Sequence, residues 1–147
     1  MMGGIDCIGI SIVYFCHYGN GNFLMAKRSN NCRDEKGNWD CGGGALEFGE
    51  DFETGVKREI KEEYCTNVID LKHLATTNVI RKNGDETTHW VALIFAAQVV
   101  SKEVKIGEPN SMEEIGWFTK DSLPDPLHSQ FHRHFDCCIK AGLASTD

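Results

Sequence analysis

The sequence predicts an α/β protein in which strands and helices pack as layers of a sandwich. Apolar residues recur at helical spacing in a central segment, and β-rich segments lie on both sides of it. A second helical segment closes the chain. The 147 residues suit one domain with a buried core, which we expect to span residues 1–147, because no internal repeat or low-complexity linker interrupts the chain.

The first third of the chain is expected to form strands and a close backbone approach. Strands are predicted at Ile5–Phe15 and Asn22–Lys27, joined by a turn at Tyr18–Asn22 whose residues tolerate positive φ. Ser29–Asn38 is polar and is expected as a surface loop. Trp39–Leu46 contains three consecutive glycines, which let the backbone come close to a neighbouring group.

A helix is predicted over Asp51–Glu63, with Asp51 as its N-cap. Apolar residues recur every four positions, and this stripe is expected to face the core. The stripe consists of Phe52, Val56, Ile60 and Tyr64.

The second half is expected to contain a long hairpin, a short strand and a closing helix. Its strands carry β-branched and aromatic residues, and the helix ends near a glycine. In order, these elements are one or two strands in Ile69–Arg81, a turn at Asn83–Gly84, a strand at Thr87–Val100, a polar loop at Ser101–Met112, a strand at Glu114–Phe118 and a helix at Leu127–Gly142.

Composition and charge argue against two kinds of partner, nucleic-acid polymers and membranes. A net charge of −7 argues against a nucleic-acid polymer as partner, but carboxylates can hold cations that bind the phosphates of a nucleotide. No stretch approaches the roughly 18 apolar residues of a membrane helix, and no membrane partner is expected. The opening Met1–Asp6 lacks the basic residues of a signal peptide, so we expect a cytoplasmic protein.

Several side chains have ordinary structural interpretations. The seven cysteines are odd in number and irregularly spaced, so we expect small buried residues in a reducing compartment, with Cys137–Cys138 partly exposed. Trp90 is expected in the core, although it is also able to stack on a base. For His128, His132 and His134 we favour a surface helix over a metal site.

Three glutamates carry the chemical signal. Glu59, Glu62 and Glu63 stand at i, i+3 and i+4, so they project from one helix face. Like charges at this spacing destabilise a helix by roughly 0.2–0.5 kcal/mol per pair, and a hard divalent cation would remove that repulsion. The upstream glycine run can offer backbone carbonyls to a metal and amides to phosphate.

The segment that contains these residues resembles the Nudix box, GX5EX7REUXEEXGU with U apolar. It runs over Gly44–Thr66, with the sequence GALEFGEDFETGVKREIKEEYCT. The fixed positions in register are Gly44, Glu50, Arg58, Glu59, Ile60, Glu62 and Glu63. Further features similar to MutT-like members are Trp39, Glu47–Glu50, Trp117–Phe118 and Leu123–Pro124. Three positions depart from the pattern: Cys65 replaces glycine, Thr66 an apolar residue, and Gly42 a frequent proline.

The resemblance implies an α/β/α sandwich with a mixed β-sheet and a divalent-metal site for Mg²⁺ or Mn²⁺. The implied metal ligands are Glu59, Glu62, Glu63 and the Gly44 carbonyl. Glu50 is implied to pair with Arg58. Arg28, Gly43 and Gly44 are implied to bind substrate.

The implied catalytic residues are Glu59, Glu62 and one glutamate from a later loop. The loop candidates are Glu108, Glu113 and Glu114, of which we prefer Glu113. Either Glu62 or the loop glutamate would orient water or take its proton.

The resemblance further implies cleavage of a diphosphate bond in a nucleotide-like small molecule, first of all a nucleoside triphosphate, canonical or oxidised, giving monophosphate and pyrophosphate. ADP-ribose, sugar-nucleotide and dinucleoside polyphosphate hydrolysis are alternatives. Asn78–Asp85 lacks the tyrosine and proline that mark the dinucleoside polyphosphate and ADP-ribose subgroups. A non-catalytic regulatory module and an isoprenoid diphosphate isomerase share the fold, and a homodimer is a further expectation.

Overall fold

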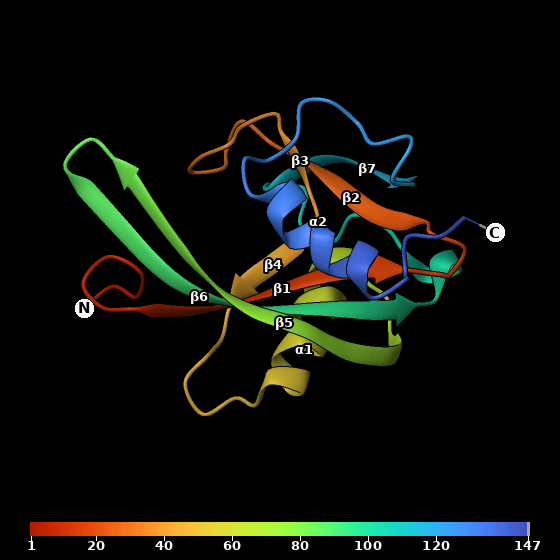
Figure 1. Cartoon of the computed structure of the whole chain (residues 1–147), viewed down its shortest axis with the longest axis horizontal. Helices are drawn as coiled ribbons and strands as arrows, with labels where there is room; N and C mark the ends of the chain where they lie inside the picture. The colour runs from red at the N-terminus through yellow and green to blue at the C-terminus, as the bar shows by residue number, and fades with distance from the viewer. Residues whose placement is uncertain (147) are drawn as a thin grey trace.

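The computed structural model describes residues 1–146, which form a seven-stranded mixed sheet with a helix on each side (Figure 1). The main strand order is β3-β2-β1-β6-β5, while β4 pairs with β1 and β7 pairs with β2. The strands are β1 (Gly9–His17), β2 (Phe23–Arg28), β3 (Trp39–Asp40), β4 (Gly42–Ala45), β5 (Val68–Asn83), β6 (Glu86–Val99) and β7 (Met112–Phe118). The helices are α1 (Phe52–Tyr64), the 3₁₀ turn η1 (Ser101–Glu103) and α2 (Phe131–Lys140).

The sheet is mixed because β1 and β6 run parallel while the other pairs are antiparallel. Successive residues of β1 point to opposite faces. Ile12 and Tyr14 pack in the core beneath α1, whereas Phe15 packs with Phe131 and Phe135 of α2. The predicted layered α/β fold with a mixed sheet is therefore confirmed.

The longest elements, β5 and β6, form one hairpin that extends well beyond the rest of the sheet (Figure 1). Asn83 pairs with Glu86, and Gly84 in the turn has a φ of 62°. The predicted turn is confirmed, and the segment left open as one or two strands is a single bulged strand.

Both ends of α1 have defined caps. The Asp51 side chain accepts a hydrogen bond from the Thr54 N–H at 2.9 Å, as expected of an N-cap. At the other end Cys65 adopts the left-handed conformation, with φ 60° and ψ 18°. This is the conformation that glycine adopts without strain, which explains the glycine of the Nudix box at this place.

Two elements begin later than predicted. β1 begins at Gly9 rather than Ile5, because Gly4 turns the chain and its N–H donates to the Cys7 carbonyl at 2.6 Å. α2 begins at Phe131 rather than Leu127, because the preceding segment is extended and forms a bridge between Leu127 and Trp39.

The first residue of the predicted apolar stripe of α1 is not buried. Phe52 is exposed, whereas Val56, Ile60 and Tyr64 are buried. The prediction was wrong for Phe52 because the first turn of α1 lies outside the core beneath the sheet.

Of the seven free cysteines only Cys16, Cys41 and Cys138 are buried, fewer than expected. Within residues 1–146, every helix is too short or too polar to cross a membrane.

Candidate active site

Two cavities adjoin around β4 and the end of β2. The larger has a volume of about 610 Å³ and lies over β1, β4, the β5–β6 hairpin and the approach to α2. The smaller has a volume of about 340 Å³ and reaches Glu63 on α1. The two share five lining residues, which are Arg28, Arg33, Asp40, Cys41 and Gly43. The acidic face of α1 therefore lies next to a space of nucleotide size.

The glycines of β4 allow side chains to lie directly against the backbone. Gly43 and Gly44 pair with Val13 and Ile12 of β1. A Cβ atom on Gly44 would lie 2.6 Å from Oε1 of Glu59, so a larger residue here would displace this carboxylate. The expected close approach is confirmed.

A bidentate ion pair fixes the loop before α1 to the helix. Arg58 Nε and Nη2 donate to Glu50 at 2.6 and 2.9 Å, and the Glu50 side chain is only 10% exposed. The hydrogen bonds to Glu50 are the main cause that raises the pKa of Arg58. Arg58 Nη1 also donates to Glu59 at 3.0 Å and to Glu62 at 3.4 Å. The Glu50–Arg58 pair is confirmed.

The three glutamates differ in their surroundings. Glu62 is 52% exposed, whereas Glu59 and Glu63 are partly buried. Burial is the main cause that raises the pKa of Glu59, against the effect of Arg58. Burial also raises the pKa of Glu63 to about 8, Tyr14 beside it acts in the opposite direction, and the charge of Glu59 adds to the rise.

Of the loop glutamates, Glu108 is the one close to this pair. The N–H groups of Lys105 and Gly107 donate to the carbonyls of Tyr64 and Glu63, at 3.1 and 2.7 Å, and so dock the loop on the end of α1. The charge of Glu108 contributes to the raised pKa of both Glu59 and Glu63.

Glu113, the preferred loop glutamate, lies elsewhere. It forms an ion pair with Lys27 on β2 at 3.5 Å, and it is 48% exposed. Its neighbour Glu114 is exposed on β7, opposite Lys27 in the register. The structure thus brings Glu108, rather than Glu113 or Glu114, to the buried glutamates.

The donor set fits a hard divalent cation in its chemistry. Burial raises the pKa of both Glu59 and Glu63, although Arg58 contacts Glu59, so their negative charges are only partly compensated. Within residues 1–146, no three acidic, histidine or cysteine side chains stand together as a complete metal site. Because Glu62 is exposed and its contact with Arg58 is long, it can turn to join the other two. Carboxylate oxygens are the ligands that Mg²⁺ and Mn²⁺ prefer.

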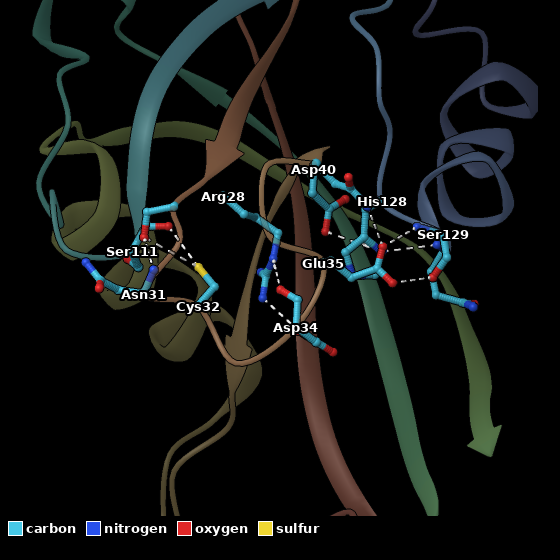
Figure 2. A network of polar contacts seen from close by, with 12 residues as sticks. Arg28, Asn31, Cys32, Asp34, Glu35, Asp40, Ser111, His128 and Ser129 are labelled. Carbon is cyan, nitrogen blue, oxygen red and sulfur yellow. Dashed lines mark hydrogen bonds and ion pairs between the residues drawn. The ribbon is translucent and has the colours of Figure 1, made fainter. Parts of the chain in front are cut away.

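Arg28 stands at the junction of the two cavities. It ends β2, lines both cavities and forms an ion pair with Asp34 at 2.9 Å (Figure 2). Its position places a guanidinium group between the acidic face of α1 and the larger cavity.

Asp40, which was not singled out from the sequence, lies near this junction together with His128. Asp40 Oδ1 accepts a hydrogen bond from the Cys41 N–H at 2.8 Å, and its Oδ2 lies 4.0 Å from His128 Nδ1 (Figure 2). Burial is the main cause that raises the pKa of Asp40. His128 lies in the extended segment before α2, so the expected surface helix carrying it is wrong.

His134 is also placed differently from the prediction. It is only 7% exposed and lines the larger cavity, and its Nε2 is buried without a hydrogen-bond partner among residues 1–146. Burial is the main cause that lowers the pKa of His134 to about 4, so the ring is neutral at pH 7. A signal was present in the sequence, because His134 lies on the helical stripe of Phe131, Phe135 and Cys138.

Trp90 forms part of the cavity wall rather than the core. It is half-buried, and it packs on Gly4 and Gly9, where a Cβ atom would enter the indole ring. The Gly4 carbonyl accepts a hydrogen bond from the His89 N–H at 2.8 Å, which holds the N-terminal turn on the hairpin.

Comparison with known proteins agrees with this geometry. A family model described as the NUDIX domain matches residues 9–137. The nucleoside triphosphatase NudI of Enterobacter sp. (strain 638) is 31% identical over 111 residues, which are 71% of this chain and 77% of that protein. An ADP-ribose pyrophosphatase of Methanocaldococcus jannaschii is 31% identical over 105 residues, which are 71% of this chain and 59% of that protein.

A solved structure extends the likeness to the fold. The MutT NUDIX hydrolase of Burkholderia pseudomallei has a TM-score of 0.78 and 29% identity, over 89% of this chain and 98% of that chain. The family match covers most of the chain, and the box residues stand where the fold brings them together. The chain therefore belongs to the Nudix domain family and is a hydrolase that acts on phosphoanhydride bonds.

Proposed function

We propose that this hydrolase is a Mg²⁺- or Mn²⁺-dependent pyrophosphohydrolase that converts a nucleoside triphosphate, canonical or oxidised, to monophosphate and pyrophosphate. The observation that carries the proposal is the junction of the two cavities. The smaller cavity reaches Glu63, and it shares Arg28 and Gly43 with a cavity of about 610 Å³. A diphosphate at the acidic face would thus leave the nucleoside in the larger space.

The metal would be held by Glu59, Glu62, Glu63 and the carbonyl of Gly44. A bound divalent cation supplies positive charge against the diphosphate oxygens and lowers the pKa of a bound water. Arg58 would keep Glu59 and Glu62 in place through its bond to Glu50.

The remaining roles fall to side chains at the cavity junction. Arg28 would bind the phosphoryl oxygens, and Gly43 would leave room for them. Glu62 or a loop glutamate would take a proton from the attacking water. We propose Glu108 for the loop role because it lies near Glu59 and Glu63, whereas Glu113 pairs with Lys27.

The larger cavity has features suited to a nucleoside. Trp90 offers an aromatic surface for a base, and the neutral His134 offers one unmatched hydrogen-bonding nitrogen. Both would contact the part of the substrate that does not react.

ADP-ribose is the second candidate substrate. The two relatives compared above have equal identity to this chain, yet one is called a nucleoside triphosphatase and the other an ADP-ribose pyrophosphatase. The proline that marks the ADP-ribose subgroup is missing from Asn78–Asp85, which favours the triphosphate. A regulatory module is disfavoured because all three glutamates of the box are present.

The test is a substrate panel with Mg²⁺ or Mn²⁺. It contains canonical and oxidised deoxynucleoside triphosphates, ADP-ribose, sugar nucleotides and dinucleoside polyphosphates, and the products are identified as phosphate or pyrophosphate. Glu63→Gln should abolish turnover, whereas the matched change Glu53→Gln, on the exposed side of the same helix, should not. Turnover of ADP-ribose alone would replace the proposed substrate, and no turnover of any compound would contradict the proposed activity.

A further inference from the structure

Two arginines from distant strands grip one carboxylate in the wall of the larger cavity. Arg28 Nη2 lies 2.9 Å from Oδ1 of Asp34, and Arg81 Nη1 lies 3.4 Å from its Oδ2. Arg28 Nε also donates to the Asp34 carbonyl at 3.1 Å. All three residues line the larger cavity. The two guanidinium groups therefore form a clamp, by which we mean Arg28 and Arg81, around a single oxyanion.

Arg81 is held in place without the help of Asp34. Its Nη2 lies 2.9 Å from Oε2 of Glu35. Glu35 is only 13% exposed, and it accepts hydrogen bonds from the Ser129 N–H and hydroxyl, both at 3.0 Å, and from the Asn38 amide at 2.9 Å (Figure 2). The position of Arg81 is thus fixed by a buried acid with several partners.

Asp34 is bound much more loosely. Its side chain is 46% exposed on the loop between β2 and β3, and its carboxylate contacts among residues 1–146 are the two arginines alone. Ion pairs of such exposed groups are weak and are screened by salt. The clamp thus combines an Arg81 that Glu35 holds in place with an anion that exchanges readily.

We propose that the clamp is a binding site for one phosphoryl group of the substrate, and that Asp34 occupies it until that phosphoryl group replaces it. Planar guanidinium groups bind phosphate oxygens in pairs, and a phosphate carries more negative charge than a carboxylate. Arg28 also lines the cavity that reaches Glu63, so the clamp lies beside the acidic face of α1. The inference rests on the proposed function and adds Arg81 and Asp34 to the residues that set substrate affinity.

The clamp is tested by the binding of inorganic tripolyphosphate, measured by calorimetry in metal-free buffer. Without metal, the acidic face of α1 repels the probe, so binding reports on the arginines. Asp34→Asn should bind it about 5-fold more tightly than the wild type, and Arg81→Gln about 10-fold more weakly. Circular dichroism of each variant checks that the fold is kept.

The matched control is Glu86→Gln. Glu86 pairs with Arg33 at 3.6 Å on the rim of the same cavity, so this variant removes one negative charge without touching the clamp. The proposal predicts a much smaller gain for this control than for Asp34→Asn. Equal gains in the two variants, or weaker or undetectable binding by Asp34→Asn, would overturn it, because Asp34 would then only position Arg28.

Steady-state kinetics separates the clamp from the proposed function. With a hydrolysed nucleotide, Asp34→Asn should lower KM and Arg81→Gln should raise it. If no nucleotide is hydrolysed but the two variants still shift tripolyphosphate binding in opposite directions, the clamp stands and the proposed function fails. If triphosphates are hydrolysed while binding is unchanged in both variants, the clamp fails alone.

Discussion

An arginine–carboxylate ion pair lies on each side of the cavity junction, and the two pairs differ in how far they are buried. On the α1 side, Arg58 binds Glu50 at 2.6 Å, and the Glu50 carboxylate is 10% exposed. On the loop side, Arg28 binds Asp34 at nearly the same distance, 2.9 Å, but the Asp34 carboxylate is 46% exposed. Burial, more than distance, therefore separates a structural ion pair from an exchangeable one.

The largest effect is expected on the α1 side. Arg58→Lys keeps the charge but loses the bidentate bond to Glu50 and the contacts to Glu59 and Glu62. We expect kcat/KM to fall about 100-fold, because groups that orient metal ligands, which is the role proposed for Arg58, have effects of this size. The exposed neighbour Lys57→Gln is the control in the same assay. A loss of less than about 10-fold would contradict this expectation.

A smaller effect is expected from a change at Glu35, the acid that holds Arg81 in place. Burial alone would raise the pKa of Glu35, but hydrogen bonds from Ser129 and Asn38 outweigh it and lower the pKa to about 2. Since the ordinary value is 4.5, ionised Glu35 stabilises the fold above pH 4.5, and this contribution is lost as the pH falls toward 2. Glu35→Gln should lower the free energy of unfolding at neutral pH by roughly 1–2 kcal/mol. This is less than the free energy that corresponds to the whole pKa shift, because solvent screens part of the interaction.

Urea unfolding at neutral pH and at several values between 4.5 and 2 measures this difference. The gap between wild type and Glu35→Gln should close across that range. The exposed Glu53→Gln serves as the control and should show no such convergence. A gap independent of pH would mean that Glu35 acts through packing instead of charge.

A third prediction concerns His134 in the wall of the larger cavity. His134→Phe removes the unmatched Nε2 and keeps the ring buried, so KM for a hydrolysed nucleotide should rise about 5-fold, the value of one neutral hydrogen bond. His132→Gln, exposed on the same helix, is the control. Because the pKa of His134 is lowered to about 4, its contribution should not change between pH 6 and pH 8. An unchanged KM would show that the ring is only a packing element.

The smallest effect concerns the end of α1. Cys65 adopts the left-handed conformation, so Cys65→Gly should raise the free energy of unfolding by about 0.5–1 kcal/mol. Thermal unfolding compared with Cys65→Ala, which keeps the strained backbone without the thiol, measures this. A loss of stability in the glycine variant would mean that thiol packing against the Gly107 segment outweighs the strain.

The two sides also differ in how far the sequence predicts them. Glu50 and Arg58 are eight residues apart within the Nudix box, so the resemblance to the family is enough to predict their contact. Glu35 and Ser129 are 94 residues apart, and no periodicity links them. The layered fold followed from periodicity, but the start of α2 did not, because it depends on pairing of Leu127 with Trp39.

The identity of the loop glutamate is also not predictable from the sequence, although the candidates are close together in the chain. Glu108 and Glu113 lie in one acidic stretch, and spacing does not distinguish them. Docking of Gly107 on the Glu63 carbonyl directs Glu108 toward the site, whereas the ion pair with Lys27 directs Glu113 away from it. Contacts made after the chain has folded back on itself decide this choice.

The turn that packs on Trp90 has a consequence for how substrate choice can diverge between relatives. Gly3 and Ile5 line the larger cavity, and Gly4 supports the indole, yet the match to the family model begins only at residue 9. Two proteins with the same Nudix box can therefore differ in the shape of the larger cavity through the few residues that precede the shared domain. An exchange of those opening residues between relatives is expected to transfer preference for a base while leaving the cleavage chemistry as it was.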